Sequence, residues 1–173
     1  MEKRDFISIL FKVAAFQIVF LWLHFAYDWF SYPWVAVFSG NSEGVFQHQK
    51  IAFLAYSIVC VLEFFLLRKK ISSPGRFFDS RLLASLLLPW MIFFWYLGPV
   101  LLQVPMPNDL LEILYANIVT ILVCVALVLL ERDFYRIDFS RTGRIIMIVM
   151  YVISAFLFVS ITFQVPWAGY FVQ

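Results

Sequence analysis

The sequence has little charge for its length. Asp, Glu, Lys and Arg make up 14% of its 173 residues, compared with about 25% in an ordinary soluble protein. Hydrophobic residues make up 64%, and so few charges cannot cover a soluble domain in which 21 Phe, 8 Tyr and 6 Trp also need burial. The composition therefore excludes a soluble enzyme, a nucleic-acid-binding protein and a disordered tail. It indicates that lipid is the solvent for most of the surface.

Histidine and cysteine are also scarce, with two of each. Two histidines cannot supply the four axial ligands of a two-haem bis-His cytochrome, although one bis-His haem between His24 and His48 stays an unfavoured option. Cys60 and Cys124 lie in apolar runs without C-x-x-C spacing, which favours packing over a disulfide or redox role. The sequence also lacks a phosphate-binding loop, a nucleophile elbow and a dinucleotide fingerprint, so it indicates no catalytic centre.

Long apolar runs are abundant, by contrast. A helix needs about 20 residues to cross a hydrocarbon layer about 30 Å thick. Five runs between charged clusters reach that length, at residues 6–27, 45–67, 82–102, 110–130 and 145–163. None shows the alternating polarity of a membrane β-barrel. We therefore expect an all-α, polytopic integral membrane protein in which residues 1–173 form one transmembrane domain of five helices.

The distribution of Lys and Arg predicts the orientation, because cytoplasmic loops carry an excess of them. The stretch before the first run and the connections after the second and fourth runs contain most of the basic residues, whereas the other side has Lys50 alone. We therefore expect the N-terminus inside and the C-terminus outside in a prokaryotic cytoplasmic (inner) membrane. The basic residues of the inner side are Lys3, Arg4, Arg68, Lys69, Lys70, Arg76, Arg81, Arg132, Arg136, Arg141 and Arg144.

Two ionisable residues lie at similar depth in the inner halves of the first two runs. Lys12 is about two turns into the first run, and Glu63 is about one turn from the end of the second. Such residues are costly in a membrane, so each is a functional candidate. Glu63 has no opposite charge four residues away, so its partner must be Lys12, Arg81 or Arg144 on another helix. We favour a structural ion pair, and a proton-carrying Glu63 is the alternative.

A polar stripe rises along the outer half of the first run. Gln17, His24 and Asp28 lie within about 40° of one another on a helix, so they are expected to face the bundle or a wet cavity. We expect the apolar segment 30–50 to fold back toward them, bringing Glu43 and His48 to the same depth. Two His and two carboxylates could bind a divalent metal, preferably zinc or iron. The alternative is a structural cluster in which Asp28 only orients His24.

The residues of this outer cluster resemble a family pattern. Segment 23–29 reads LHFAYDW and segment 42–50 reads SEGVFQHQK, which resembles the H-F-x-Y-[DE]-W and N-E-S-x-W-E-H-x-K patterns of an uncharacterised family of small multi-spanning prokaryotic membrane proteins. Segment 81–90 is similar to the third helix of that family. The resemblance implies a shared fold and no activity. The family glutamate is replaced by Gln47, which weakens a metal or acid-base role. The retained residues are His24, Tyr27, Asp28, Trp29, Glu43, His48 and Lys50, and the other departures are Ser42, Gly44 and Phe46.

These patterns favour a membrane protein without a catalytic centre of its own. We expect an accessory or structural subunit of a membrane complex, or a protein that binds a hydrophobic ligand, because its many aromatic residues suit packing against lipid, another subunit or such a ligand. The alternative is a proton- or metal-coupled transporter, or a metal-dependent membrane enzyme, that uses the outer cluster His24, Asp28, Glu43 and His48. No nucleic-acid partner is expected, since the net charge of +2 conceals an asymmetry between the two sides of the membrane.

Overall fold

The computed structural model describes residues 3–40, 44–102 and 108–163, with helices and no strand in these ranges. Five of the helices are long and apolar enough to cross a membrane, which confirms the all-α polytopic fold class. The elements are α1 (Lys3–Trp29), α2 (Pro33–Phe38), α3 (Val45–Leu67), α4 (Pro74–Leu101), α5 (Asp109–Phe134) and α6 (Arg141–Ser160).

Most of the long helices extend beyond the apolar runs from which they were predicted. α3 occupies the expected range 45–67, but α1 begins before residue 6, α4 before residue 82 and α6 before residue 145, and α5 continues past residue 130. A span that is predicted by counting apolar residues ends at the first charged residue. A helix, however, can continue into the membrane interface, where charged side chains reach water or neighbouring charges. These extensions add Glu131 and Arg81 to helices, and both belong to the site described below.

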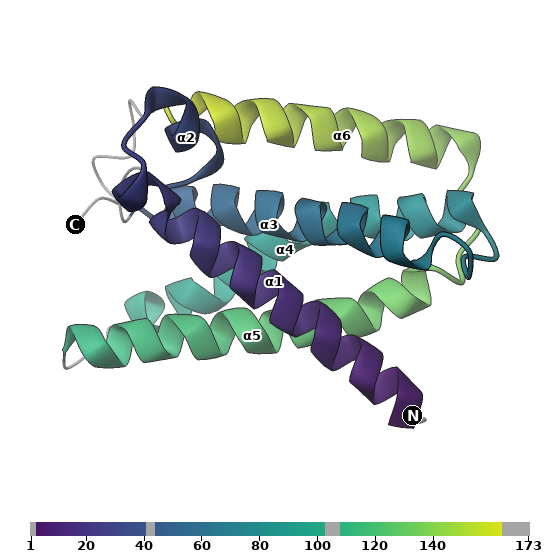
Figure 1. Ribbon diagram of the computed structural model, residues 1–173, viewed down its shortest axis with the longest axis horizontal. Helices are drawn as coiled ribbons and strands as arrows, with labels where there is room; N and C mark the ends of the chain where they lie inside the picture. Colours follow the sequence, from purple (N-terminus) through teal and green to yellow (C-terminus); the bar gives the residue numbers. More distant parts are fainter. Residues whose placement is uncertain (1–2, 41–43, 103–107, 164–173) are drawn as a thin grey trace.

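The five long helices form a bundle in which α1 crosses α3 and α5 obliquely (Figure 1). α4 packs against α3, α5 and α6. The N-terminal end of α1 lies at the same end of the bundle as the α3–α4 and α5–α6 connections, on the right of Figure 1. We call this end, which carries most of the Lys and Arg residues, the basic end. The other end, with α2 and the last turn of α6, is the opposite end. Placement of the basic end in the cytoplasm stays a prediction.

The centre of the bundle is formed by aliphatic, small and aromatic side chains on α1, α3, α4 and α5. Phe16, Ala52, Ala55 and Leu88 have no exposed surface, and the Phe16 ring contacts Tyr56 edge-on with their centroids 6.0 Å apart. Small residues on α3 let neighbouring helices approach closely, which is how membrane helices gain van der Waals contact without a hydrophobic driving force. The outer surface is equally apolar, as expected for side chains that contact lipid.

Proline in α4 is compensated by a side chain from the neighbouring helix. Pro99 has no amide hydrogen, so it cannot donate to the carbonyl of Trp95 four residues earlier. The Tyr115 hydroxyl of α5 donates to that oxygen at 2.9 Å. A backbone acceptor that lipid could not satisfy is therefore hydrogen-bonded within the protein.

The segment between α1 and α3 folds onto the opposite end of the bundle. α2 packs against α1 and α3, with Val35 and Ala36 buried. The Lys50 side chain has no exposed surface, and its Nζ donates to the Ala36 carbonyl at 2.7 Å and to the Thr162 hydroxyl at 2.8 Å. Lys50 therefore joins α2, α3 and the end of α6.

Candidate functional site

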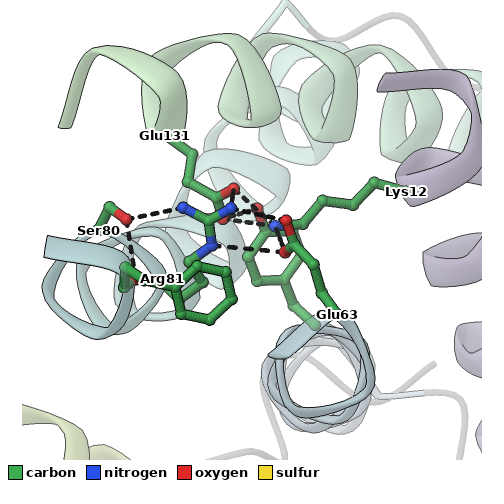
Figure 2. Close-up of polar contacts among 7 residues, drawn as sticks. Lys12, Glu63, Ser80, Arg81 and Glu131 are labelled. Atoms are coloured by element: carbon green, nitrogen blue, oxygen red, sulfur yellow. Dashed lines mark hydrogen bonds and ion pairs between the residues drawn. The ribbon is translucent and has the colours of Figure 1, made fainter. Parts of the chain in front are cut away.

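Four ionisable side chains from four different helices meet inside the bundle toward the basic end (Figure 2). We call Lys12 on α1, Glu63 on α3, Arg81 on α4 and Glu131 on α5 the buried charge network. The exposed fractions of Lys12, Arg81, Glu63 and Glu131 are 8%, 14%, 17% and 2%. Two positive and two negative groups make the network neutral as a set.

Lys12 is the centre of the network. Its Nζ donates to Glu63 Oε2 at 2.6 Å and to the two carboxylate oxygens of Glu131 at 2.6 and 2.8 Å. The Tyr56 hydroxyl donates to Glu131 Oε2 at 2.7 Å. The three donor hydrogens of one ammonium group are thus directed at two carboxylates, and Glu131 gains a neutral donor as well.

Arg81 of α4 completes the network. Its Nη2 donates to Glu63 Oε1 at 2.6 Å and lies 3.4 Å from Glu131 Oε1, and its Nη1 donates to the Ser80 hydroxyl at 2.9 Å. Its guanidinium carbon lies 4.0 Å from the centroid of the Phe77 ring. Stacking on an aromatic face is typical of a partly buried guanidinium, which is more weakly hydrated than an ammonium.

The geometry favours a structural role for these four charges over a role in acid-base chemistry. Desolvating four ions is costly, and only their close mutual pairing and hydrogen bonds offset that cost. Each carboxylate already accepts hydrogen bonds from a cation, so neither is placed as an unoccupied base. The network therefore links α1, α3, α4 and α5 through polar contacts whose geometry is specific.

The same place contains the sole group of three potential metal ligands within the described ranges. Atoms of Cys60, Glu63 and Glu131 lie within 4.8 Å of one another. The Lys12 ammonium donates to both carboxylates there. It supplies the positive charge that a bound cation would bring, so a metal could bind this group only by displacing Lys12.

α6 is joined to the bundle by polar contacts of its own. Arg144 donates from Nε and Nη2 to the Asp79 carboxylate of α4 at 2.8 and 2.7 Å. Asp79 is 2% exposed and Arg144 is 45% exposed. Farther along, the Tyr151 hydroxyl donates to the Ser57 hydroxyl of α3 at 2.8 Å. These two contacts hold one face of α6 against α3 and α4.

An exposed ion pair at the basic end joins Arg76, in the first turn of α4, to Asp138 in the α5–α6 connection. Arg76 donates two hydrogen bonds to Asp138, and these bonds and the charge of Arg76 hold the pKa of Asp138 below its usual range. The pair therefore contributes to stability above the ordinary carboxyl pKa. That contribution disappears as the pH falls through the lowered value, and it is small because solvent screens exposed pairs.

The sequence identified three of the four residues of the buried charge network, all except Glu131. Lys12 and Arg81, both considered as partners for Glu63, bind it together, whereas Arg144 binds Asp79 instead. Glu131 was missed because it directly follows an apolar run and looks like the boundary of a span. It lies on the buried face of α5, which the sequence does not distinguish because both faces of this helix are apolar. The buried residues of that face are Val119, Thr120, Val123, Cys124, Leu127, Val128 and Glu131.

The predicted outer cluster is divided between two neighbouring helices. The His24 ring on α1 and the His48 ring on α3 have centroids 5.1 Å apart, and Gln17 donates to Asn117 of α5 at 2.9 Å. Asp28 is exposed near the end of α1, and Glu43 lies outside the described residues. Within the described ranges, His24, Asp28 and His48 do not bring three ligand atoms within 4.8 Å of one another. A metal site here stays a prediction.

His48 contacts the backbone at the start of α3. His48 Nδ1 lies 3.1 Å from the Gly44 carbonyl, and because a carbonyl oxygen only accepts, Nδ1 carries the hydrogen in this contact. In a neutral imidazole with its hydrogen on Nδ1, Nε2 is the nitrogen that can bind a metal. Two histidines alone do not define a particular metal.

The fold and site define a class, a helical multi-pass membrane protein with a neutral charge network inside its bundle. No protein-family model matches the sequence, and comparisons with curated proteins and with solved structures find no match. The resemblance of segments 23–29 and 42–50 to an uncharacterised family stays a prediction. Function is therefore inferred from the chain's own residues.

Proposed function

We propose that the protein is a non-catalytic accessory subunit of a larger complex in a prokaryotic cytoplasmic membrane. The observation that carries this proposal is the matching of charge inside the bundle, where Lys12 and Arg81 bind Glu63 and Glu131. A carboxylate already hydrogen-bonded to a cation is poorly placed to take a proton from a substrate. The most polar part of the interior thus serves to hold four helices together, and the protein acts through the surface that they present.

We propose that α6 is the helix that contacts the partner subunit. Of its 20 residues, Met147 and Phe158 are the buried ones, so α6 has much less contact with the bundle than the other spans have. Arg144 and Tyr151 still hold one side of it firmly in place. A rigid helix with exposed side chains such as Val152 and Phe156 is suited to packing against a helix of another subunit.

Photocrosslinking from the native membrane tests this proposal. A crosslinking amino acid at Phe156 on α6 is expected to capture one membrane protein, which also copurifies with the unmodified chain in a fixed ratio. The same amino acid at Leu122 provides the control, because this equally apolar and exposed position lies on α5. A monodisperse monomer, or equal capture from both positions, would contradict the proposal.

Proton transport is the second candidate function, and one observation favours it. Glu63 borders a cavity at the basic end, and hydrogen bonds continue from Glu63 through Lys12 and Glu131 to Tyr56. Such a chain is a route by which a proton could enter the bundle. Proton flux into liposomes containing the purified protein, lost in Glu131→Gln and retained in Lys69→Gln, would support this function over an accessory role. The absence of flux in the unmodified protein would exclude it.

A further inference from the structure

A basic cavity opens beside the buried charge network. It has a volume of about 370 Å³ and lies between the end of α3, the start of α4 and the end of α5. Four cations border it, Lys70, Arg81, Arg132 and Arg136, together with the single carboxylate of Glu63. Four positive groups and one negative group give the lining a charge of +3, whereas the network itself is neutral. Arg136 also forms an exposed ion pair with Asp133 at 3.2 Å, and the lining as a whole keeps an excess of positive charge around this cavity.

The remaining walls of the cavity are apolar and aromatic. Leu67, Ile71 and Phe77 border it with Tyr135. Tyr135 is held in place, since its hydroxyl lies 2.9 Å from the Ser72 hydroxyl and accepts from the Ser73 amide at 3.3 Å. A site lined by several cations and by apolar side chains matches an amphiphile whose anionic group is attached to a hydrophobic chain.

We propose that this cavity binds the phosphate-bearing headgroup of an anionic phospholipid from the adjoining leaflet. Basic pockets between transmembrane helices bind such headgroups through charge-assisted hydrogen bonds. A volume near 370 Å³ is at the lower end for small-molecule sites, so it accommodates a headgroup and leaves the acyl chains outside. Leu67, at the end of α3, borders the cavity and is 39% exposed, so it provides apolar surface for those chains.

Arg81 gives the cavity a positioned donor. Its Nε and Nη2 bind Glu63, and its Nη1 donates one hydrogen to Ser80. Since each terminal nitrogen of a guanidinium carries two hydrogens, Nη1 has a second N–H. The Phe77 ring, against which the guanidinium stacks, restricts the direction of that N–H. Three other cations border the cavity and add positive charge, namely Lys70, Arg132 and Arg136.

Binding of short-chain lipids to the purified protein in neutral detergent tests the proposal. Dioctanoyl phosphatidylglycerol is expected to bind at least about tenfold more tightly than dioctanoyl phosphatidylcholine. The double variant Lys70→Gln/Arg132→Gln is expected to lose that preference. Both changes leave Arg81 and the buried charge network intact, and Lys70→Gln alone, expected to lose part of the preference, serves if the double variant elutes as an aggregate.

A matched variant separates a defined site from general surface charge. Lys69→Gln/Arg141→Gln removes the same charge from the basic end, at positions that do not border the cavity, and it should retain the lipid preference. Glycerol 3-phosphate provides the soluble comparison. The proposal is overturned by equal affinity for the two lipids, by equal loss in both double variants, or by glycerol 3-phosphate binding as tightly as phosphatidylglycerol, which would assign the cavity to a soluble phosphate compound.

Discussion

Replacement of Lys12 by methionine is expected to destabilise the protein by about 4 kcal/mol, which corresponds to a fall in melting temperature of about 10 °C. The substitution removes the hydrogen bonds that Nζ makes to Glu63 and Glu131. Arg81 would then be the one remaining cation for two carboxylates in the network. Since Glu131 is 2% exposed, its uncompensated charge has almost no access to water. Thermal unfolding in detergent measures the effect.

A double-mutant cycle distinguishes the effect of charge from that of lost packing. Lys12→Met/Glu131→Gln restores neutrality, with Arg81 and Glu63 still paired at 2.6 Å. The double variant is therefore expected to be more stable than Lys12→Met alone, with a coupling energy of about 2 kcal/mol. Lys69→Met, the same substitution in an exposed connection, should change stability by less than about 0.5 kcal/mol. Additive losses in the cycle would show that the network has no electrostatic coupling.

Replacement of Arg144 by glutamine is expected to cost about 3 kcal/mol and to loosen α6 from the bundle. Arg144 donates three hydrogen bonds to the Asp79 carboxylate, at 2.7 to 3.1 Å. Asp79 is 2% exposed and carries the desolvation cost, whereas Arg144 is 45% exposed and can still reach water or headgroups. Loss of the Arg144 side chain is therefore expected to destabilise the protein more than loss of the Asp79 charge. Thermal unfolding measures the stability, and the rate of proteolysis in the α5–α6 connection measures the loosening.

The reciprocal substitution should be milder. Asp79→Asn removes the buried charge and should cost about 1 to 2 kcal/mol, and combining it with Arg144→Gln should recover much of the loss caused by Arg144→Gln alone. Arg141→Gln provides the control, because Arg141 is exposed in the first turn of the same helix. If Asp79→Asn proved the more damaging of the two single changes, the desolvation argument for Asp79 would be wrong.

The sequence does not show which face of each helix is buried, because side chains that contact lipid are apolar as well. In a soluble helix, polar residues mark the face that meets water, so apolar periodicity reveals the core. In α5 the buried Val123 and Leu127 alternate with exposed Ile121 and Leu122, and both faces are apolar. Glu131 therefore had no visible register with the buried face. Lys12 and Glu63 were found because they interrupt apolar runs.

The outer cluster shows a second limit of the sequence. Helical spacing places His24 and Asp28 on one side of α1. The approach of His48 to His24 depends on the path of the chain through α2 and on where α3 begins. That path follows from tertiary contacts, such as the one between Lys50 and the Ala36 carbonyl. No local pattern specifies a contact between residues 14 positions apart in a non-repeating segment.

What the sequence by itself determined is the class of protein and its spans, because hydropathy is a local property and lipid requires every crossing to be long, apolar and hydrogen-bonded within itself. Tertiary structure alone decided which charges meet. Glu131 joins Lys12, Glu63 and Arg81, while Arg144 binds Asp79. Long-range ion pairs depend on how helices cross and rotate about their axes, and side-chain packing between the helices decides that geometry.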